Sequence, residues 1–119
     1  MNLGDTYIIE GHLWIVVSDP VADGSVAMVN LTSHKPPCDE TCILNPGDHP
    51  FVRHKTIVKY CWATMVTPQK QVEVTRRFPA RAPVGGALLA KIQRGALTSE
   101  ATKPKIATAI EATLKKTKP

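Results

Sequence analysis

Short apolar runs separated by turn-forming residues mark strands over the first two-thirds of the chain. Residues 6–9 are rich in β-branched and aromatic side chains, and residues 13–17 form a continuous apolar run. Apolar positions alternate over residues 25–32, which predicts a hairpin with the preceding run. Residues 42–44 and 56–62 predict further strands. Short strands joined by Gly/Pro turns favour a small closed barrel, because closure leaves no exposed strand edge.

The pattern changes after Pro68. Residues 69–77 are polar and basic, and the prolines of residues 78–83 predict an extended linker, because a proline disfavours helical geometry in the residue before it. Residues 87–94 predict a helix that Gly95 ends. A second helix follows, with Pro104 in its first turn. Its apolar stripe recurs every four residues, at Ile106, Ile110 and Leu114.

These elements predict a mainly β fold with C-terminal helices. The length of 119 residues fits one domain. We expect a β-barrel over residues 1–67, a basic linker over 68–86 and a helical extension over 87–119 that belongs to the same domain. A barrel of this size has a small core, so the helices must cover a barrel face or a second subunit.

The net charge of +5 is unevenly distributed. Residues 1–66 carry four Lys/Arg and seven Asp/Glu, a balance of −3, whereas residues 67–119 carry eleven and three, a balance of +8. The basic half can attract an anionic partner, either nucleic acid or an acidic protein segment. The alternative is a solvated helical tail without a specific partner.

Several features favour a cytoplasmic protein. The longest apolar run, residues 13–17, is far shorter than the about 20 apolar residues that span a bilayer. The first residues show no basic segment followed by an apolar stretch, so we expect no secretory signal and no membrane association. Three cysteines are an odd number, which favours reduced thiols over a disulfide framework.

Common enzyme signatures are missing from the chain. There is no glycine-rich loop before a helix and no Gly-x-Ser-x-Gly elbow, which argues against the usual nucleotide-binding and serine-hydrolase sites. Polar side chains gather instead at the predicted strand ends. They are His12, residues 32–34 and residues 49–55.

Four segments together resemble the MazF/PemK toxins of bacterial type II toxin–antitoxin systems. They are Gly4-Asp5, HLWIVVS at residues 12–18, VAMVNLTS at 26–33 and TIV at 56–58, in family-like order over about residues 3–66. The resemblance implies a small SH3-like barrel and a metal-independent endoribonuclease that cleaves single-stranded RNA without a cofactor. It also implies a homodimer, and an antitoxin peptide lying in the RNA groove. We expect that antitoxin to be acidic.

The resemblance also suggests site residues. His12 and Leu13 stand where the family usually has an arginine-proline pair, and Thr32-Ser33 match the family threonine-serine. We hypothesise that His12 transfers the proton, because histidine titrates near physiological pH, and that Thr32 hydrogen-bonds the scissile phosphate. His12 replaces the family arginine, whose positive charge would stabilise the negative charge on the phosphate during cleavage. That positive charge would come from Arg53 or Lys55 instead. The RNA-binding candidates are Ser33, Arg53, His54 and Lys55.

Three alternatives stay open. The chain can be a non-catalytic SH3-like barrel that binds nucleic acid or a protein partner. Cys38, Cys42, His49 and His54 lie within seventeen residues and offer zinc ligands, or the two cysteines a reversible disulfide. Tyr60 and Trp62, two residues apart on a predicted strand, share a face that can stack on RNA bases or pack in a core or dimer interface.

Overall fold

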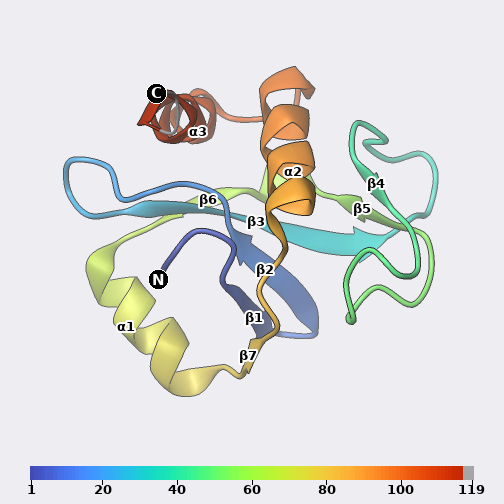
Figure 1. Cartoon of the computed structure of the whole chain (residues 1–119), viewed down its shortest axis with the longest axis horizontal. Coiled ribbons are helices and arrows are strands. Elements are labelled where there is room, and N and C mark those ends of the chain that lie inside the picture. Colours follow the sequence, from blue (N-terminus) through green and yellow to red (C-terminus); the bar gives the residue numbers. More distant parts are fainter. Residues whose placement is uncertain (117–119) are drawn as a thin grey trace.

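A computed structural model describes residues 1–116 and shows an antiparallel sheet of seven strands with three helices (Figure 1). Helices α2 and α3 lie against one side of the sheet, and α1 lies against the other. The elements are β1 (Thr6–Ile9), β2 (His12–Val16), β3 (Val26–Ser33), β4 (Ile43–Leu44), β5 (Thr56–Val58), the 3₁₀ turn η1 (Tyr60–Trp62), β6 (Thr64–Val66), α1 (Pro68–Arg77), β7 (Ala80–Arg81), α2 (Gly86–Thr98) and α3 (Pro104–Lys116).

The long strand β3 organises the sheet. The strand order is β4-β5-β3-β2-β1-β7, and β6 also pairs with β3. Residues 26–28 of β3 pair with β6, and residues 31–33 pair with β5. The η1 turn joins these two partners of β3. The strands predicted from residues 6–9, 13–17 and 25–32 therefore form the centre of the sheet.

The expected closed barrel is not formed, because the two ends of the sheet do not pair. The end strands β4 and β7 contain two residues each, which is too short for a continuous ladder between them. A side chain connects the two regions instead. The Nε2 atom of His49, between β4 and β5, lies 2.6 Å from the carbonyl oxygen of Ala82, which follows β7.

Alternating side chains give the sheet two packed faces. On one face, β2 and β3 contribute Leu13, Ile15 and Val29, which pack against Ile92 of α2 and Ile110 of α3. On the other face, a smaller core joins β1, β2, β3 and β6 to α1. The members of this second core are Tyr7, Val16, Val26, Met28, Val66 and Val74, with Met1, Ile9, Trp14 and Phe78 partly buried around them.

The range expected to be a basic linker contains helix α1 and strand β7. The Thr67 side chain accepts a hydrogen bond from the Lys70 backbone N–H and so caps α1, and Pro68 occupies its first turn. Val74 is the buried residue of the helix, so α1 has too narrow an apolar stripe for periodicity to reveal it. The extended segment expected over residues 78–83 has no helix and contains β7.

Helix α2 continues through Gly95 instead of ending there, and Ser99 is its C-cap. Gly95 packs against Tyr60, as an added Cβ would lie 2.3 Å from the Tyr60 hydroxyl. The predicted second helix is confirmed, since α3 begins at Pro104 and buries Ile106 and Ile110. Residues 117–119 of the expected helical extension lie outside the described residues.

The expectation that Tyr60 and Trp62 share a strand face is wrong. Strand β5 ends at Val58, and both aromatic residues lie in η1. A 3₁₀ turn has three residues per turn, so side chains two positions apart point in different directions. Tyr60 is fully buried and donates a hydrogen bond to the Ile92 carbonyl, whereas Trp62 is 49% exposed.

No helix among residues 1–116 combines the length and the apolar character that crossing a membrane requires.

Candidate functional site

A tight turn places His12 at the first position of β2. Glu10 and Gly11 form the two-residue connection between β1 and β2, and both have positive φ angles, of 50° and 84°. Such a turn is the type I′ geometry that suits the twist of a hairpin, and glycine adopts its second position without strain. Ile9 and His12 therefore form the last pair of the ladder.

The imidazole of His12 has a defined hydrogen bond. Its Nδ1 atom lies 3.2 Å from the carbonyl oxygen of Leu31 on the neighbouring strand. A carbonyl oxygen only accepts hydrogen bonds, so Nδ1 carries the proton in this contact. In the neutral ring the Nε2 atom then keeps its lone pair. The half-buried His12 side chain thus presents a proton acceptor at the sheet surface.

The strand register brings Thr32 to the same face as His12. Trp14 on β2 lies opposite Asn30 on β3, and opposed residues point to the same side of a sheet. His12 and Thr32 stand two residues beyond these partners, each on its own strand, so they too share that side. Both side chains are half-buried. Ser33 is the next residue along β3 and points to the opposite side.

A tryptophan and a lysine complete the surroundings of His12. The Trp62 ring meets the His12 ring edge-on, with centroids 6.2 Å apart and an interplanar angle of 87°. The Lys59 ammonium lies 3.7 Å from the centroid of the Trp62 ring, which is cation–π geometry. The positive charge beside this ring system is therefore Lys59. Sequence reasoning missed this role for Lys59. Lys59 and Trp62 are three residues apart, and their side chains meet because the chain forms a 3₁₀ turn there instead of the expected strand.

Asn30 lies in the floor of this face. Its side chain is fully buried, and neither Oδ1 nor Nδ2 has a hydrogen-bond partner among the described residues. Its backbone carbonyl accepts a 3.0 Å hydrogen bond from the Lys59 backbone N–H. An unsatisfied buried polar group costs about 1–3 kcal/mol, so it calls for an explanation. We call the surface of His12, Thr32, Lys59 and Trp62, with Asn30 beneath it, the His12 face.

The other RNA-binding candidates lie near the end of β3 and on the preceding loop of β5. Ser33 Oγ and His54 Nε2 are 2.8 Å apart and form a hydrogen bond. Lys55 is exposed next to His54. Arg53 lines a shallow groove that also contains His49. The five candidate residues beyond His12 thus divide, with Thr32 on the His12 face and Ser33, Arg53, His54 and Lys55 elsewhere.

The geometry gives no support to the zinc alternative. Among residues 1–116, no three His, Cys, Asp or Glu side chains are arranged to hold a metal ion. His49 uses both ring nitrogens, because Nδ1 accepts from the Phe51 backbone N–H and Nε2 donates to the Ala82 carbonyl. Burial raises the pKa of the Cys42 thiol, which disfavours the thiolate that a metal needs. Cys38, Cys42 and Cys61 are free thiols.

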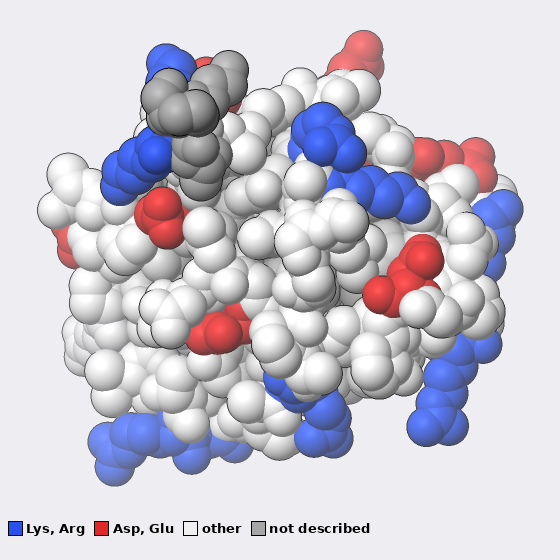
Figure 2. All heavy atoms as spheres, viewed as in Figure 1, with Lys and Arg blue, Asp and Glu red and all other residues white. Residues whose placement is uncertain are grey.

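Basic residues flank the same side of the sheet. Lys70, Arg76 and Arg77 of α1 and Arg81 of β7 are exposed, and α1 packs on the face that carries Trp14. Figure 2 shows Lys and Arg side chains along the lower edge of the molecule, over the region of α1 and β7. Exposed cations beside an aromatic surface are the arrangement that attracts a phosphate backbone.

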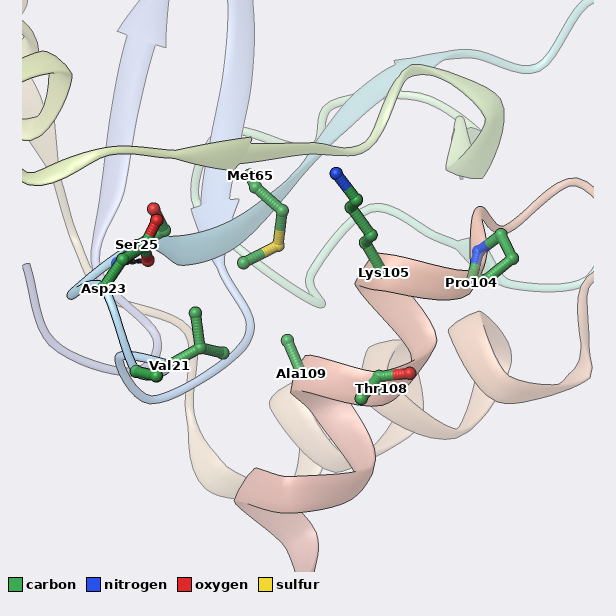
Figure 3. Close-up of a pocket in the computed structure, with 9 residues that line it drawn as sticks. Val21, Asp23, Ser25, Met65, Pro104, Lys105, Thr108 and Ala109 are labelled. Atoms are coloured by element: carbon green, nitrogen blue, oxygen red, sulfur yellow. Dashed lines mark hydrogen bonds between the residues drawn. The ribbon is translucent and has the colours of Figure 1, made fainter.

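A separate apolar groove lies between the β2–β3 loop, β6 and α3. Figure 3 shows Met65 from β6 and Ala109 from α3 along it, with Lys105 at one end and Asp23 at the other. None of the residues of the His12 face lines this groove. Its mostly apolar walls hold no paired acid and base, so we place the candidate chemistry at the His12 face.

No known protein family, curated protein or solved structure matches this chain.

Proposed function

We propose that this protein is a metal-independent endoribonuclease that binds single-stranded RNA on the His12 face. The observation that carries the proposal is the His12 imidazole. Its Nδ1–H bond to the Leu31 carbonyl leaves Nε2 as a proton acceptor, on the same sheet face as the Thr32 hydroxyl and next to Trp62. A positioned base and a hydroxyl donor serve phosphodiester cleavage, and an exposed aromatic ring serves the binding of unpaired bases.

The chemistry is attack by the ribose 2′-hydroxyl on the adjacent phosphorus. His12 Nε2 takes the 2′-hydroxyl proton as the 2′-oxygen–phosphorus bond forms, which contributes about 10²–10⁴-fold. The phosphorus–5′-oxygen bond breaks, and the 5′-oxygen receives a proton from the imidazolium. The products are a 2′,3′-cyclic phosphate and a 5′-hydroxyl. No metal takes part in these steps.

The remaining residues of the His12 face stabilise and hold the substrate. The Thr32 hydroxyl donates to a phosphoryl oxygen, and the Lys59 ammonium offsets the negative charge that develops there. Lys59 thereby takes the place of the cation that we expected from Arg53 or Lys55. Trp62, which is 49% exposed, stacks on an unpaired base, worth about 1–3 kcal/mol. Ser33, Arg53, His54 and Lys55 lie outside the His12 face, so in this proposal they contact only RNA that continues past the cleaved step around the end of β3.

The proposal includes the MazF/PemK-like identity that the sequence resembles. The division of β3 between β5 and β6, with η1 joining them, supports an SH3-like sheet that remains open. In that case the protein is the cytoplasmic toxin of a type II pair, works as a homodimer and is inhibited by an acidic antitoxin. Co-purification with the product of a neighbouring reading frame, and the mass in solution, test these partners.

Cleavage of a mixed-sequence RNA in the presence of EDTA tests the enzyme activity. We expect cleavage by the wild type and a loss of about 10²-fold or more in His12→Ala. Thr32→Ala should lose a smaller part of the rate. His34→Ala serves as the control, because this histidine bonds to Glu40 outside the His12 face. Undiminished cleavage by both site variants would exclude the assignment.

A second candidate function is RNA binding without cleavage. The Lys59–Trp62 pair favours it, because stacking and charge attraction need no proton acceptor. This candidate is correct if the wild type binds a labelled RNA and does not cleave it in any condition. Trp62→Ala should then lose the binding.

A further inference from the structure

The buried carboxamide of Asn30 is not explained by the fold. It is completely covered, and neither polar atom bonds to a described residue. Valine, methionine and isoleucine occupy comparable positions on this sheet, so an apolar residue would fill the site without this cost. A polar residue at such a position therefore points to a bound group that completes its hydrogen bonds.

Asn30 lies between Trp14 and Lys59 in the sheet. Trp14 lies opposite Asn30 on β2. On the other side the β3–β5 register, extended by one residue, places Lys59 opposite, and the Lys59 backbone N–H bonds to the Asn30 carbonyl. Thr32 stands two residues further on the same side of β3. The carboxamide thus lies below the surface that we propose for RNA.

We propose that Asn30 reads one unpaired nucleobase, and that adenine is the base it prefers. This inference rests on the proposed function. The Nδ2 group donates to adenine N7, and Oδ1 accepts from the adenine N6 amino group. The base reaches the carboxamide when the side chains that cover Asn30 move aside, and the half-exposed Trp62 indole, beside Lys59, then stacks on it.

The chemistry of the carboxamide favours a base over a phosphate. A phosphate offers acceptors only, so it would satisfy Nδ2 and leave Oδ1 facing a negative charge. A nucleobase edge presents a donor next to an acceptor, which matches both atoms of the carboxamide. The backbone contacts of Thr32 and Lys59 and the base contact of Asn30 are then separate parts of one site.

Binding of 2′-fluoro oligo(A), oligo(U) and oligo(C), which lack the attacking hydroxyl, tests this inference by fluorescence anisotropy. We expect the wild type to prefer oligo(A). In Asn30→Leu, oligo(A) binding should weaken about 5- to 150-fold, while the other two change little. The melting temperature of Asn30→Leu should rise by about 2–8 °C, because the unsatisfied carboxamide is gone.

Two further variants keep the test decisive. Met28→Leu, on the same face and strand, is the matched control and should keep the preference for oligo(A). Asn30→Val removes both polar atoms with a β-branched side chain that occupies comparable positions on this sheet, and it should lose that preference even if Asn30→Leu fails to fold. A lower melting temperature in Asn30→Leu with unchanged base preference would show a purely structural residue.

The outcomes separate this inference from the proposed function. If the wild type binds no oligonucleotide, the proposed function fails and the base site fails with it. If the wild type binds, and its base preference is absent or survives in Asn30→Leu and Asn30→Val, only the base site is overturned.

Discussion

Gly95→Ala tests how α2 packs on the sheet. An ideal Cβ at position 95 would lie 2.3 Å from the Tyr60 hydroxyl oxygen and 3.1 Å from Cys42 Cβ. The Tyr60 ring is fully buried, and its hydroxyl donates a 2.7 Å hydrogen bond to the Ile92 carbonyl. The ring therefore cannot move away from the new methyl group without weakening this bond.

The magnitude follows from opposing terms. In an exposed helix, replacing glycine by alanine gains about 1 kcal/mol. Here overpacking costs about 1–3 kcal/mol, and loss of the Tyr60 hydrogen bond costs about 0.5–1.5 kcal/mol. The net loss in unfolding free energy is about 0.5–3.5 kcal/mol.

Urea denaturation of the variants measures this loss. Gly86→Ala in the same helix is the control, because no atom lies within 4 Å of its added Cβ, and it should be neutral or stabilising. Tyr60→Phe removes the atom nearest to the new methyl group, so the double variant should lose less than the sum of the single losses. A stabilised Gly95→Ala, or strictly additive losses, would refute the packing described here.

Three further predictions concern single side chains. Trp62→Ala should weaken single-stranded RNA binding by about 1–3 kcal/mol and Trp62→Phe much less, measured by anisotropy; equal losses would argue against stacking. His49→Leu should lower the unfolding free energy by about 1–3 kcal/mol, because the bond to Ala82 disappears, and a chelator should leave wild-type melting unchanged. The hydrogen bond from His34 lowers the pKa of Glu40. The ionised Glu40 therefore adds to the unfolding free energy above the ordinary carboxyl pKa, and this stabilisation is lost as the pH falls through the lowered pKa. The melting-temperature difference between wild type and Glu40→Gln should be small at pH 6 and should shrink as the pH falls below the ordinary carboxyl pKa of 4.5, and a difference that does not shrink in acid would contradict this.

Elements with a regular apolar pattern were predictable from the sequence. The apolar run of β3 and the four-residue repeat of α3 both match the structure, because the repeat in α3 marks its buried side and the run in β3 is buried on both sides. Helix α1 escaped prediction because Val74 alone is buried in it. The prediction that Gly95 ends α2 was wrong. From the sequence alone, a glycine within a helix cannot be distinguished from one that ends it, and here Gly95 lies within α2 and packs against Tyr60.

The site was predictable only in part. His12 and Thr32 stood out as polar residues at strand ends, and the register places them on one side of the sheet. The placement of Lys59 beside Trp62 depends on η1, which no local sequence pattern predicted. Asn30 looked like one member of an alternating strand, since burial without a partner is a property of the packed structure alone. Long-range contacts therefore decide what the sequence leaves ambiguous.

The identity of the product ends tests the central claim most directly. Mass spectrometry of fragments from an RNA cleaved in EDTA should show 2′,3′-cyclic phosphates and 5′-hydroxyls, and a 2′-deoxy sugar at the cleaved position should block the reaction. His12→Ala should produce neither fragment at a comparable rate. Fragments with 3′-hydroxyl and 5′-phosphate ends, or cleavage next to a 2′-deoxy sugar, would contradict proton transfer from the 2′-hydroxyl to His12.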